Sequence, residues 1–247
     1  MRYFIELAYD GTRYHGWQIQ PNAISVQQVL TDVGSNYFNN SDFSLTGCGR
    51  TDTGVHAEEF YAHFDYATAI DIPKAVHNLN NMLPKDIAIK TICKVDDLLH
   101  ARFSAISRTY KYHLHYQKNP FIRWQSYRHY RKLDIDKMNA ACGFLFNHRD
   151  FTSFSKVNTE AHTNDCVITQ ARWEHSETGI VFTIQANRFL RNMVRAIVGT
   201  MIEIGEGKIE QEDFNEIINS KDRGKAGKSV PANGLSLVAV KYPNNTL

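Results

Sequence analysis

Two predicted strands are joined by the stretch Phe43-Ser44-Leu45-Thr46-Gly47-Cys48-Gly49-Arg50-Thr51-Asp52-Thr53-Gly54-Val55-His56. Its apolar start predicts a strand near 43–48, and the run that begins at Glu59 predicts a second over 57–66. The glycines between them allow positive φ and close approach by a partner. The loop presents the carboxylate of Asp52 and the guanidinium of Arg50. Loops that end strands and present such groups often carry binding and chemistry.

A simpler interpretation of Asp52 is an Asx turn or a helix N-cap. No helical pattern of apolar residues follows it, so the sequence predicts no helix for it to cap. Arg50 is not needed for a turn, whereas a guanidinium suits a nucleic-acid backbone or an extruded base. We therefore treat Asp52 as a candidate catalytic residue and Arg50 as a candidate binding residue.

The first half of the chain predicts the order β-α-β-β-α-β. Strands are expected over 2–9, 43–48, 57–66 and 87–92. One helix begins after Ser25, with Gln28 three residues later as in a capping box. A second helix begins after Asp71 and ends at Pro84.

The second half repeats that order with one added helix. Strands are expected over 109–116, 167–174, 179–186 and 235–241, and helices from Asp134, from about 190 and over 210–219. The helix after Asp134 is expected to turn Phe146 toward the core. Long parts of 118–133 and 153–166 are interpreted as loops that contact RNA.

The repetition of a split βαβ unit predicts an α+β fold of two pseudo-symmetric halves that resemble RRM or ferredoxin-like domains. We expect the halves to be 1–105 and 106–247, joined in a mostly antiparallel sheet with helices packed on it and a central cleft. On the helix from 190, Arg191 and Arg195 should lie one turn apart beside the apolar stripe. They either extend from a surface helix into solvent or line the cleft.

Composition points to RNA through the distribution of charge, because the net charge of the 247 residues is only +2. The stretch from Leu98 to Leu133 contains no acidic residue and mixes arginine and lysine with aromatic residues. Charge runs are usually solvated faces, but this mixture suits phosphate contact and base stacking. Arg102 and Arg108 lie within it.

Several classes of site are excluded by spacing. The scattered residues Cys48, Cys93, Cys142 and Cys166 support neither a zinc site nor a disulfide framework. The run from Lys221 to Ser229 lacks the first glycine of a phosphate-binding loop. Without a membrane span or a signal-peptide core, the sequence predicts a cytoplasmic chain.

The loop around Asp52 resembles the active-site loop of the tRNA pseudouridine synthase I (TruA) family. Other motifs follow in the family's order over nearly the whole chain: Tyr9–Gln18, Ser25–Gln27, His100–Ala105, Arg108–Tyr112, Asp150–Phe154, Asn192–Arg195 and Gly234–Leu237. The resemblance implies two α/β halves around an RNA-binding cleft, in a homodimer. It also implies an enzyme that converts uridine to pseudouridine at positions 38, 39 and 40 of the tRNA anticodon arm, without a cofactor or metal.

The same resemblance implies roles for individual residues. Asp52 would be the nucleophile, paired with Arg195. Tyr110 would stack on the uracil or act as a base, with Leu235 packed beneath. Arg50 would occupy the space that the flipped base vacates. Arg102, Arg108 and Arg191 complete the expected RNA-binding set.

Two other functions are compatible with parts of the sequence. Asp52-Thr53-Gly54 is the tripeptide of aspartic proteases, but that site requires two copies and the chain has one. The second alternative is a non-catalytic RNA-binding protein with two RRM-like halves. Asp52 distinguishes this alternative from the enzyme. A carboxylate weakens binding to phosphates, so in a protein that only binds RNA, Asp52→Asn should improve or spare function.

Overall fold

A computed structural model describes residues 1–156 and 163–243 of the chain. In these residues five α-helices accompany nine strands, which form a mostly antiparallel sheet. The predicted α+β class is therefore confirmed. The chain divides into two compact units, Met1–Ser107 with Leu237–Leu247 and Arg108–Ser236. The last strand thus crosses from the second unit into the first. Residues 157–162 of the predicted loop 153–166 lie outside the described residues.

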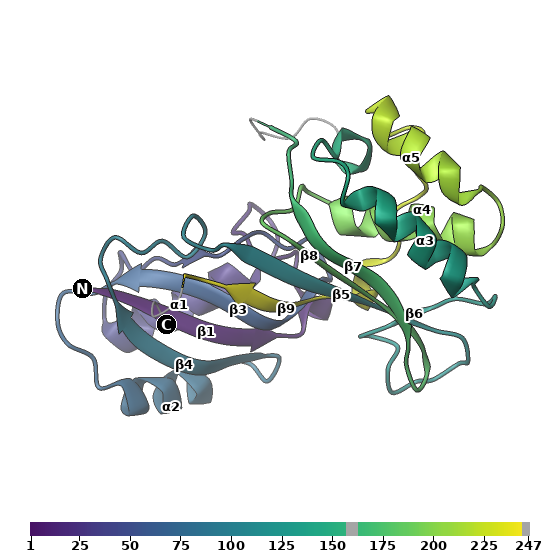
Figure 1. Ribbon diagram of the computed structural model, residues 1–247. Helices are drawn as coiled ribbons and strands as arrows, with labels where there is room; N and C mark the ends of the chain where they lie inside the picture. Colours follow the sequence, from purple (N-terminus) through teal and green to yellow (C-terminus); the bar gives the residue numbers. More distant parts are fainter. Residues whose placement is uncertain (157–162, 244–247) are drawn as a thin grey trace. The chain divides into compact units, whose positions relative to one another are not determined.

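The first unit follows the predicted β-α-β-β-α-β order. Its elements are β1 (Arg2–Tyr9), α1 (Val26–Phe38), β2 (Thr46–Gly47), β3 (His56–Asp65), α2 (Ile72–Met82) and β4 (Ile87–Val95). Strand β1 lies between β3 and β4 and is antiparallel to both. The two helices pack side by side on one face of these strands (Figure 1). The predicted strand near 43–48 is shorter than expected, although Phe43 and Leu45 are buried.

Local sequence explains where these two helices begin. The Ser25 hydroxyl accepts a hydrogen bond from the Gln28 N–H (3.2 Å), and the Asp71 carboxylate accepts one from the Lys74 N–H (3.2 Å). Each satisfies an N–H that the helix leaves without an internal partner. Only half of the predicted capping box forms, because the Gln28 side chain bonds Asp32.

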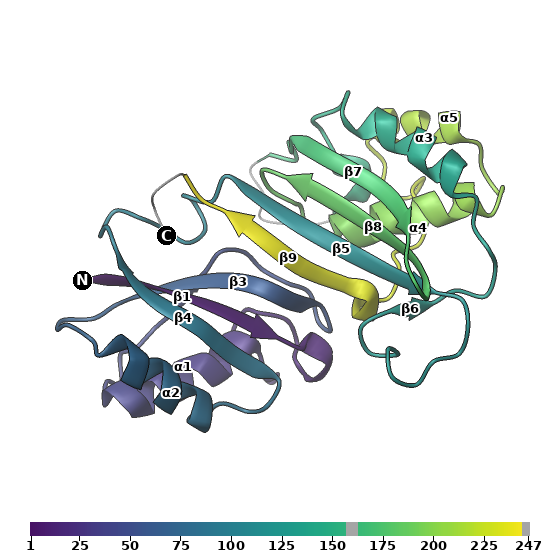
Figure 2. The same ribbon diagram turned by 60° about the horizontal axis from the view of Figure 1, so that its bottom comes forward.

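The second unit also alternates strands and helices. Its elements are β5 (Ser107–His115), β6 (Tyr127–Arg128), α3 (Ile135–Leu145), β7 (Ile168–His175), β8 (Gly179–Ala186), α4 (Met193–Gly205), α5 (Gln211–Ser220) and the start of β9 (Leu235–Lys241). Strand β8 lies between β5 and β7 and is antiparallel to both. The helices α3, α4 and α5 pack against one another on one side of these strands (Figure 2).

Three sequence predictions for the helices of this unit are wrong. The helix expected from about 190 begins at Met193, because Asn192 takes the left-handed conformation with φ 67°. Arg191 therefore precedes α4 and does not share its face with Arg195. The helix is also buried on all sides, except at Arg195 and Glu203, where a single apolar stripe was expected. Phe146, expected in the core, is 49% exposed, because α3 ends one residue before it.

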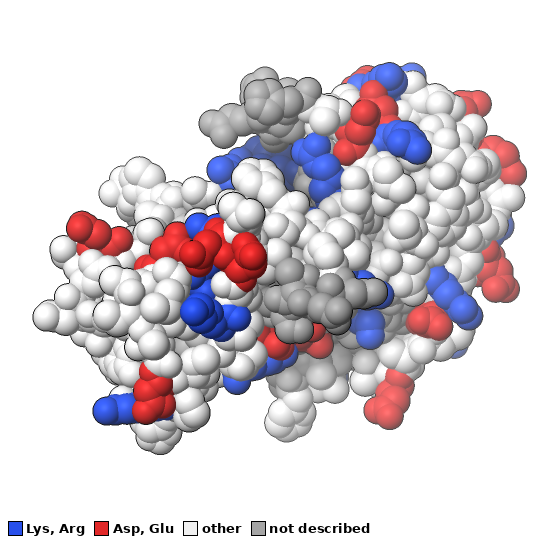
Figure 3. Space-filling view, turned by 60° about the vertical axis from the view of Figure 1, so that its left-hand side comes forward, with Lys and Arg blue, Asp and Glu red and all other residues white. Residues whose placement is uncertain are grey.

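The surface and the thiols agree with the composition. In the view of Figure 3, basic and acidic side chains are interspersed. All four cysteines are free thiols. Among the described residues, no helix combines the length and the apolar character needed to cross a membrane.

Candidate active site

Asp52 lies on a tight turn between β2 and β3. We call residues 48–55 the aspartate loop. The Asp52 carbonyl accepts a hydrogen bond from the Val55 N–H (3.1 Å), and Gly54 has φ +79°. A positive φ at the third residue is the signature of a type II turn, which glycine adopts without strain. Strand β3 follows directly, so the absence of a helix after Asp52 is confirmed. Asp52 is half-buried and Arg50 is exposed.

A second segment holds the backbone of the aspartate loop in place. We call residues 9–17 the N-terminal clamp. The Trp17 N–H donates to the Thr51 carbonyl (3.3 Å), and the Gly54 N–H donates to the Tyr14 carbonyl (3.2 Å). At Gly16, with φ +81°, an added Cβ would lie 2.2 Å from the Thr51 carbonyl oxygen. The two backbones therefore touch on both sides of Asp52, and only glycine fits at position 16.

Side chains add further bonds between the clamp and the loop. The Tyr9 hydroxyl and the Thr51 hydroxyl form a buried hydrogen bond of 2.9 Å. The Gly11 N–H donates to His56 Nδ1 (3.1 Å), and that nitrogen also lies 3.1 Å from an Asp10 carboxylate oxygen. Asp52 is thus flanked by fixed residues on each side, which restricts where its carboxylate can lie.

Trp17 fills the space beneath the start of the loop. Its ring stacks on Phe60 with centroids 4.1 Å apart, and it is 2% exposed. A Cβ at Gly47 would lie 2.6 Å from the Trp17 ring, so glycine is required where β2 enters the loop. Sequence reasoning did not assign these clamp residues to the site. The signal in the sequence was the pair Gly11 and Gly16, which precede Trp17 in the motif Tyr9–Gln18.

The clamp is bonded in turn to Asp86, which lies between α2 and β4. The Tyr14 hydroxyl and Arg13 Nε each donate to the Asp86 carboxylate, both at 2.6 Å. Burial acts to raise the pKa of Asp86, but the hydrogen bonds from Arg13 and Tyr14 outweigh it and lower that pKa below its ordinary value. Burial, together with the bond to Asp86, raises the pKa of Tyr14. Tyr14 therefore stays a hydrogen-bond donor at neutral pH.

In the second unit, alternation along β5 separates two tyrosines. Tyr110 is half-buried, lies opposite Ile184 and packs edge-to-face against Phe189 with centroids 5.2 Å apart. Tyr112 is fully buried and donates to the Pro231 carbonyl (2.8 Å). Burial raises the pKa of Tyr112, so its hydroxyl keeps its proton. Tyr112 serves the core, and Tyr110 is the tyrosine with exposed surface.

Arg195 is oriented by the segment that precedes β9. Its Nε donates to the Val230 carbonyl (2.8 Å), and the Val230 N–H donates to the Arg195 carbonyl (3.2 Å). The neighbouring Ser229 hydroxyl is bonded by Asn192 Nδ2 (2.6 Å) and by Arg223 Nη2 (3.0 Å). The Arg195 guanidinium is therefore oriented through Nε by a segment that is itself held in place by bonds to residues 229–230.

The other expected residues occupy different surroundings. Leu235 is 5% exposed at the start of β9. Arg108 is half-buried and donates from Nη1 to the Asn187 carbonyl (2.8 Å). Arg191 is exposed, just before α4.

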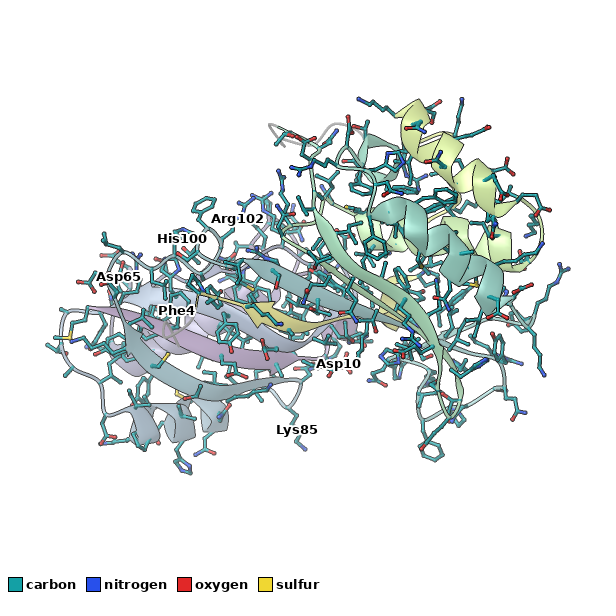
Figure 4. All side chains as sticks on the ribbon, in the orientation of Figure 1. Phe4, Asp10, Asp65, Lys85, His100 and Arg102 are labelled. Atoms are coloured by element: carbon teal, nitrogen blue, oxygen red, sulfur yellow. The ribbon has the colours of Figure 1, made fainter. Side chains whose placement is uncertain are left out.

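Arg102 does not lie beside the aspartate loop, although both belong to the first unit. Its neighbour Ala101 donates its N–H to His63 Nδ1 (3.1 Å), and His63 is paired with Phe4, near the start of β1. The aspartate loop contacts the residues at the end of β1. Figure 4 shows Arg102 and His100 along the upper edge of this unit, away from Asp10.

The expected site residues offer three kinds of functional group: a carboxylate, guanidinium groups and a tyrosine hydroxyl. Within residues 1–156 and 163–243, no group of three or more histidine, cysteine or acidic side chains is arranged to hold a metal ion. Asp52 and Arg50 belong to the first unit, whereas Tyr110, Arg195 and Leu235 belong to the second.

Comparison with known proteins identifies the family. The family described as tRNA pseudouridine synthase matches residues 145–243. The chain is 52% identical to tRNA pseudouridine synthase A of Bacteroides fragilis over 98% of its own length and 96% of that protein. It is 51% identical to that of Bacteroides thetaiotaomicron, over 99% of this chain and 91% of the relative. The same enzyme of Bacillus pumilus is 35% identical over 96% and 98% of the two chains. The chain therefore belongs to the tRNA pseudouridine synthase A (TruA) family of isomerases.

Proposed function

We propose that the protein converts uridine to pseudouridine at positions 38, 39 and 40 of the tRNA anticodon arm, with Asp52 as the catalytic carboxylate and no cofactor. The observation that carries this proposal is the aspartate loop itself. Backbone bonds from Trp17 and to Tyr14 hold it on both sides of Asp52. Fixing a reactive group in advance removes the entropy cost of positioning it during the reaction.

The reaction rearranges bonds without oxidation or reduction. The N1–C1′ bond of uridine breaks, the base turns, and a C5–C1′ bond forms. The proton on C5 is lost, and N1 gains one, so substrate and product are isomers. Asp52 can act by attack on C1′, by addition to the uracil ring or by removal of a sugar proton. Each route needs the carboxylate in its ionised form.

We propose that Arg195 pairs with Asp52 during catalysis and holds it ionised. Support comes from the way the side chain is oriented, because Arg195 Nε donates to the Val230 carbonyl (2.8 Å) in the segment that precedes β9. An oriented guanidinium suits a carboxylate, which it can bond with two parallel N–H groups.

The target nucleotide must leave its stack before a protein carboxylate can reach its sugar. We propose that Tyr110 stacks on the extruded uracil and that Leu235 packs beneath it. Arg50, exposed on the aspartate loop, would occupy the vacated space. Arg102, Arg108 and Arg191 would contact phosphates farther along the RNA.

The larger arrangement is also part of this proposal. The first unit would supply the aspartate and the second the tyrosine and the arginine, around a central RNA-binding cleft between two pseudo-symmetric halves. As the family resemblance implies, the enzyme would act as a homodimer in the cytoplasm, where its tRNA substrate occurs.

The test is pseudouridine content, measured by nucleoside analysis of tRNA transcripts after incubation with the enzyme. Wild type should convert transcripts with uridine at 38, 39 or 40 and leave a transcript with cytidine at all three unchanged. Asp52→Asn should bind the same tRNA and form no pseudouridine. If Asp52→Asn binds more tightly and the wild type makes no pseudouridine, the protein is a non-catalytic RNA-binding protein.

A further inference from the structure

The loop between β5 and α3, residues 116–134, exposes aromatic side chains that the proposed reaction does not use. We call it the aromatic loop. Phe121 is 90% exposed, Tyr130 is 79% exposed and Trp124 is 49% exposed. Exposed large aromatics together indicate a surface that meets a partner.

Two of these aromatic rings carry an arginine on one face. The Arg123 Cζ lies 4.6 Å from the centroid of the Trp124 ring, and the Arg128 Cζ lies 4.7 Å from that of Tyr130. Cation–π contact holds each guanidinium against its ring. Arg123 thus lies against the indole of Trp124, and Trp124 keeps 49% of its surface exposed.

The aromatic loop has a defined structure around Trp124. The Asn233 side chain donates to the Arg123 carbonyl (2.9 Å) and to the Ser126 carbonyl (3.0 Å), on either side of Trp124. His115 Nδ1 and the Ser126 hydroxyl form a buried hydrogen bond of 2.9 Å. Asn233 lies two residues before Leu235, so the same short segment positions both Leu235 and the aromatic loop.

The charge of the loop favours RNA over protein as its partner. No acidic residue occurs between Leu98 and Leu133, whereas the loop carries Arg123, Arg128, Arg131 and Lys132. The centres of protein–protein interfaces are depleted of charged residues. Phosphates require cations, and unpaired bases stack on aromatic rings.

We propose that Trp124, backed by Arg123, is a stacking platform for an unpaired base of the tRNA anticodon loop. The proposal rests on the proposed function, because that function makes the anticodon arm the substrate. A base on the exposed indole surface would place base, indole and guanidinium in one stack. Such a contact accepts any base and distinguishes a loop from a closed helix, whose bases already stack on one another.

Tryptophan fluorescence tests this contact directly, because the chain has 3 tryptophans and two of them are buried. Trp17 is 2% exposed and Trp173 is 1% exposed, so no base can stack on either. An anticodon stem-loop RNA should quench the emission of the wild-type protein. A closed duplex with the same stem sequence should quench it far less. Trp124→Phe should still bind the stem-loop and lose the quenching.

Affinity measurements separate stacking from charge. Trp124→Ala removes one base–aromatic stack. It should therefore bind the stem-loop about 5- to 150-fold more weakly than the wild type. The dependence of affinity on salt should stay the same, since no phosphate contact is removed. Phe146→Ala is the matched control, because Phe146 is also 49% exposed but lies at the end of α3, and it should leave affinity unchanged.

The possible results separate this proposal from the proposed function. Unchanged affinity and quenching in Trp124→Ala, with normal pseudouridine formation by the wild type, would overturn the stacking platform and leave the function intact. A wild type that forms no pseudouridine would overturn the function. A shift of Trp124→Ala from dimer to monomer in sedimentation, at unchanged RNA affinity per protomer, would show a protein interface and overturn the platform.

Discussion

Replacing Gly16 by alanine should damage both stability and catalysis, because Gly16 is where the N-terminal clamp touches the aspartate loop. The new Cβ would lie 2.2 Å from the Thr51 carbonyl oxygen, whereas ordinary contact begins at 3.4 Å. Both groups belong to the backbone, so no rotamer change relieves the clash and the loop must move by about 1 Å. The φ of +81° adds about 1–2 kcal/mol for a residue with a side chain.

The expected result for Gly16→Ala is a loss of about 2–4 kcal/mol in the free energy of unfolding. For a chain of this size, that corresponds to a fall in Tm of about 5–15 °C. A displacement of about 1 Å at Asp52 should also lower kcat by about 100-fold. The affinity for tRNA should change little, since the clamp is not expected to contact RNA.

Thermal unfolding and single-turnover pseudouridine formation measure these two effects. Gly49→Ala is the matched control for stability, because Gly49 lies in the same loop and an added Cβ there meets nothing within 4 Å. It should keep the wild-type Tm. A Gly16→Ala protein with wild-type Tm and wild-type kcat would refute the reasoning that the clamp positions Asp52.

Three further predictions concern single residues. Asn192→Ala should lower the free energy of unfolding, measured by urea denaturation, by about 2–3 kcal/mol, because the backbone there is left-handed and the bond to Ser229 is lost. Asn192→Gly loses only the bond and should lower it by about 1 kcal/mol. Equal losses in the two variants would contradict this reasoning. Burial lowers the pKa of His63 to about 4, so the unfolded chain, with an ordinary value of 6.5, takes up the proton first. Stability should therefore be complete above about pH 6.5 and fall by up to about 3 kcal/mol toward pH 4, and a His63→Gln profile of equal slope would exclude His63 as the cause. Asp134→Ala should lose about 1 kcal/mol in the same assay, because Asp134 caps α3; an unchanged midpoint would show that the cap contributes nothing.

Features set by neighbours in the sequence could be predicted. Ser25, Asp71 and Asp134 each cap the helix that was expected to follow them. A cap depends on a side chain and an N–H three residues away, so the sequence contains all the information it needs. The strand after the aspartate loop, β3, also forms where its sequence predicts it, whereas the strand before the loop forms only at Thr46–Gly47.

Features set by tertiary contact could not be predicted from the sequence. The start of α4 was expected too early, because apolar residues before Asn192 continue the helical spacing and only the left-handed Asn192 interrupts it. The clamp was missed because Gly11 and Gly16 act through residues about forty positions later in the chain. Their spacing beside Trp17 suggests a turn, but nothing local reveals what it touches.

The central claim is that Asp52 performs the chemistry, and release of tritium from tRNA labelled at uracil C5 tests it most directly, because replacing the C5 proton is intrinsic to the reaction. The wild type should release tritium in proportion to the pseudouridine formed. Asp52→Ala should release none while it keeps the wild-type Tm and tRNA affinity. Tritium release by Asp52→Ala at the wild-type rate would contradict the account.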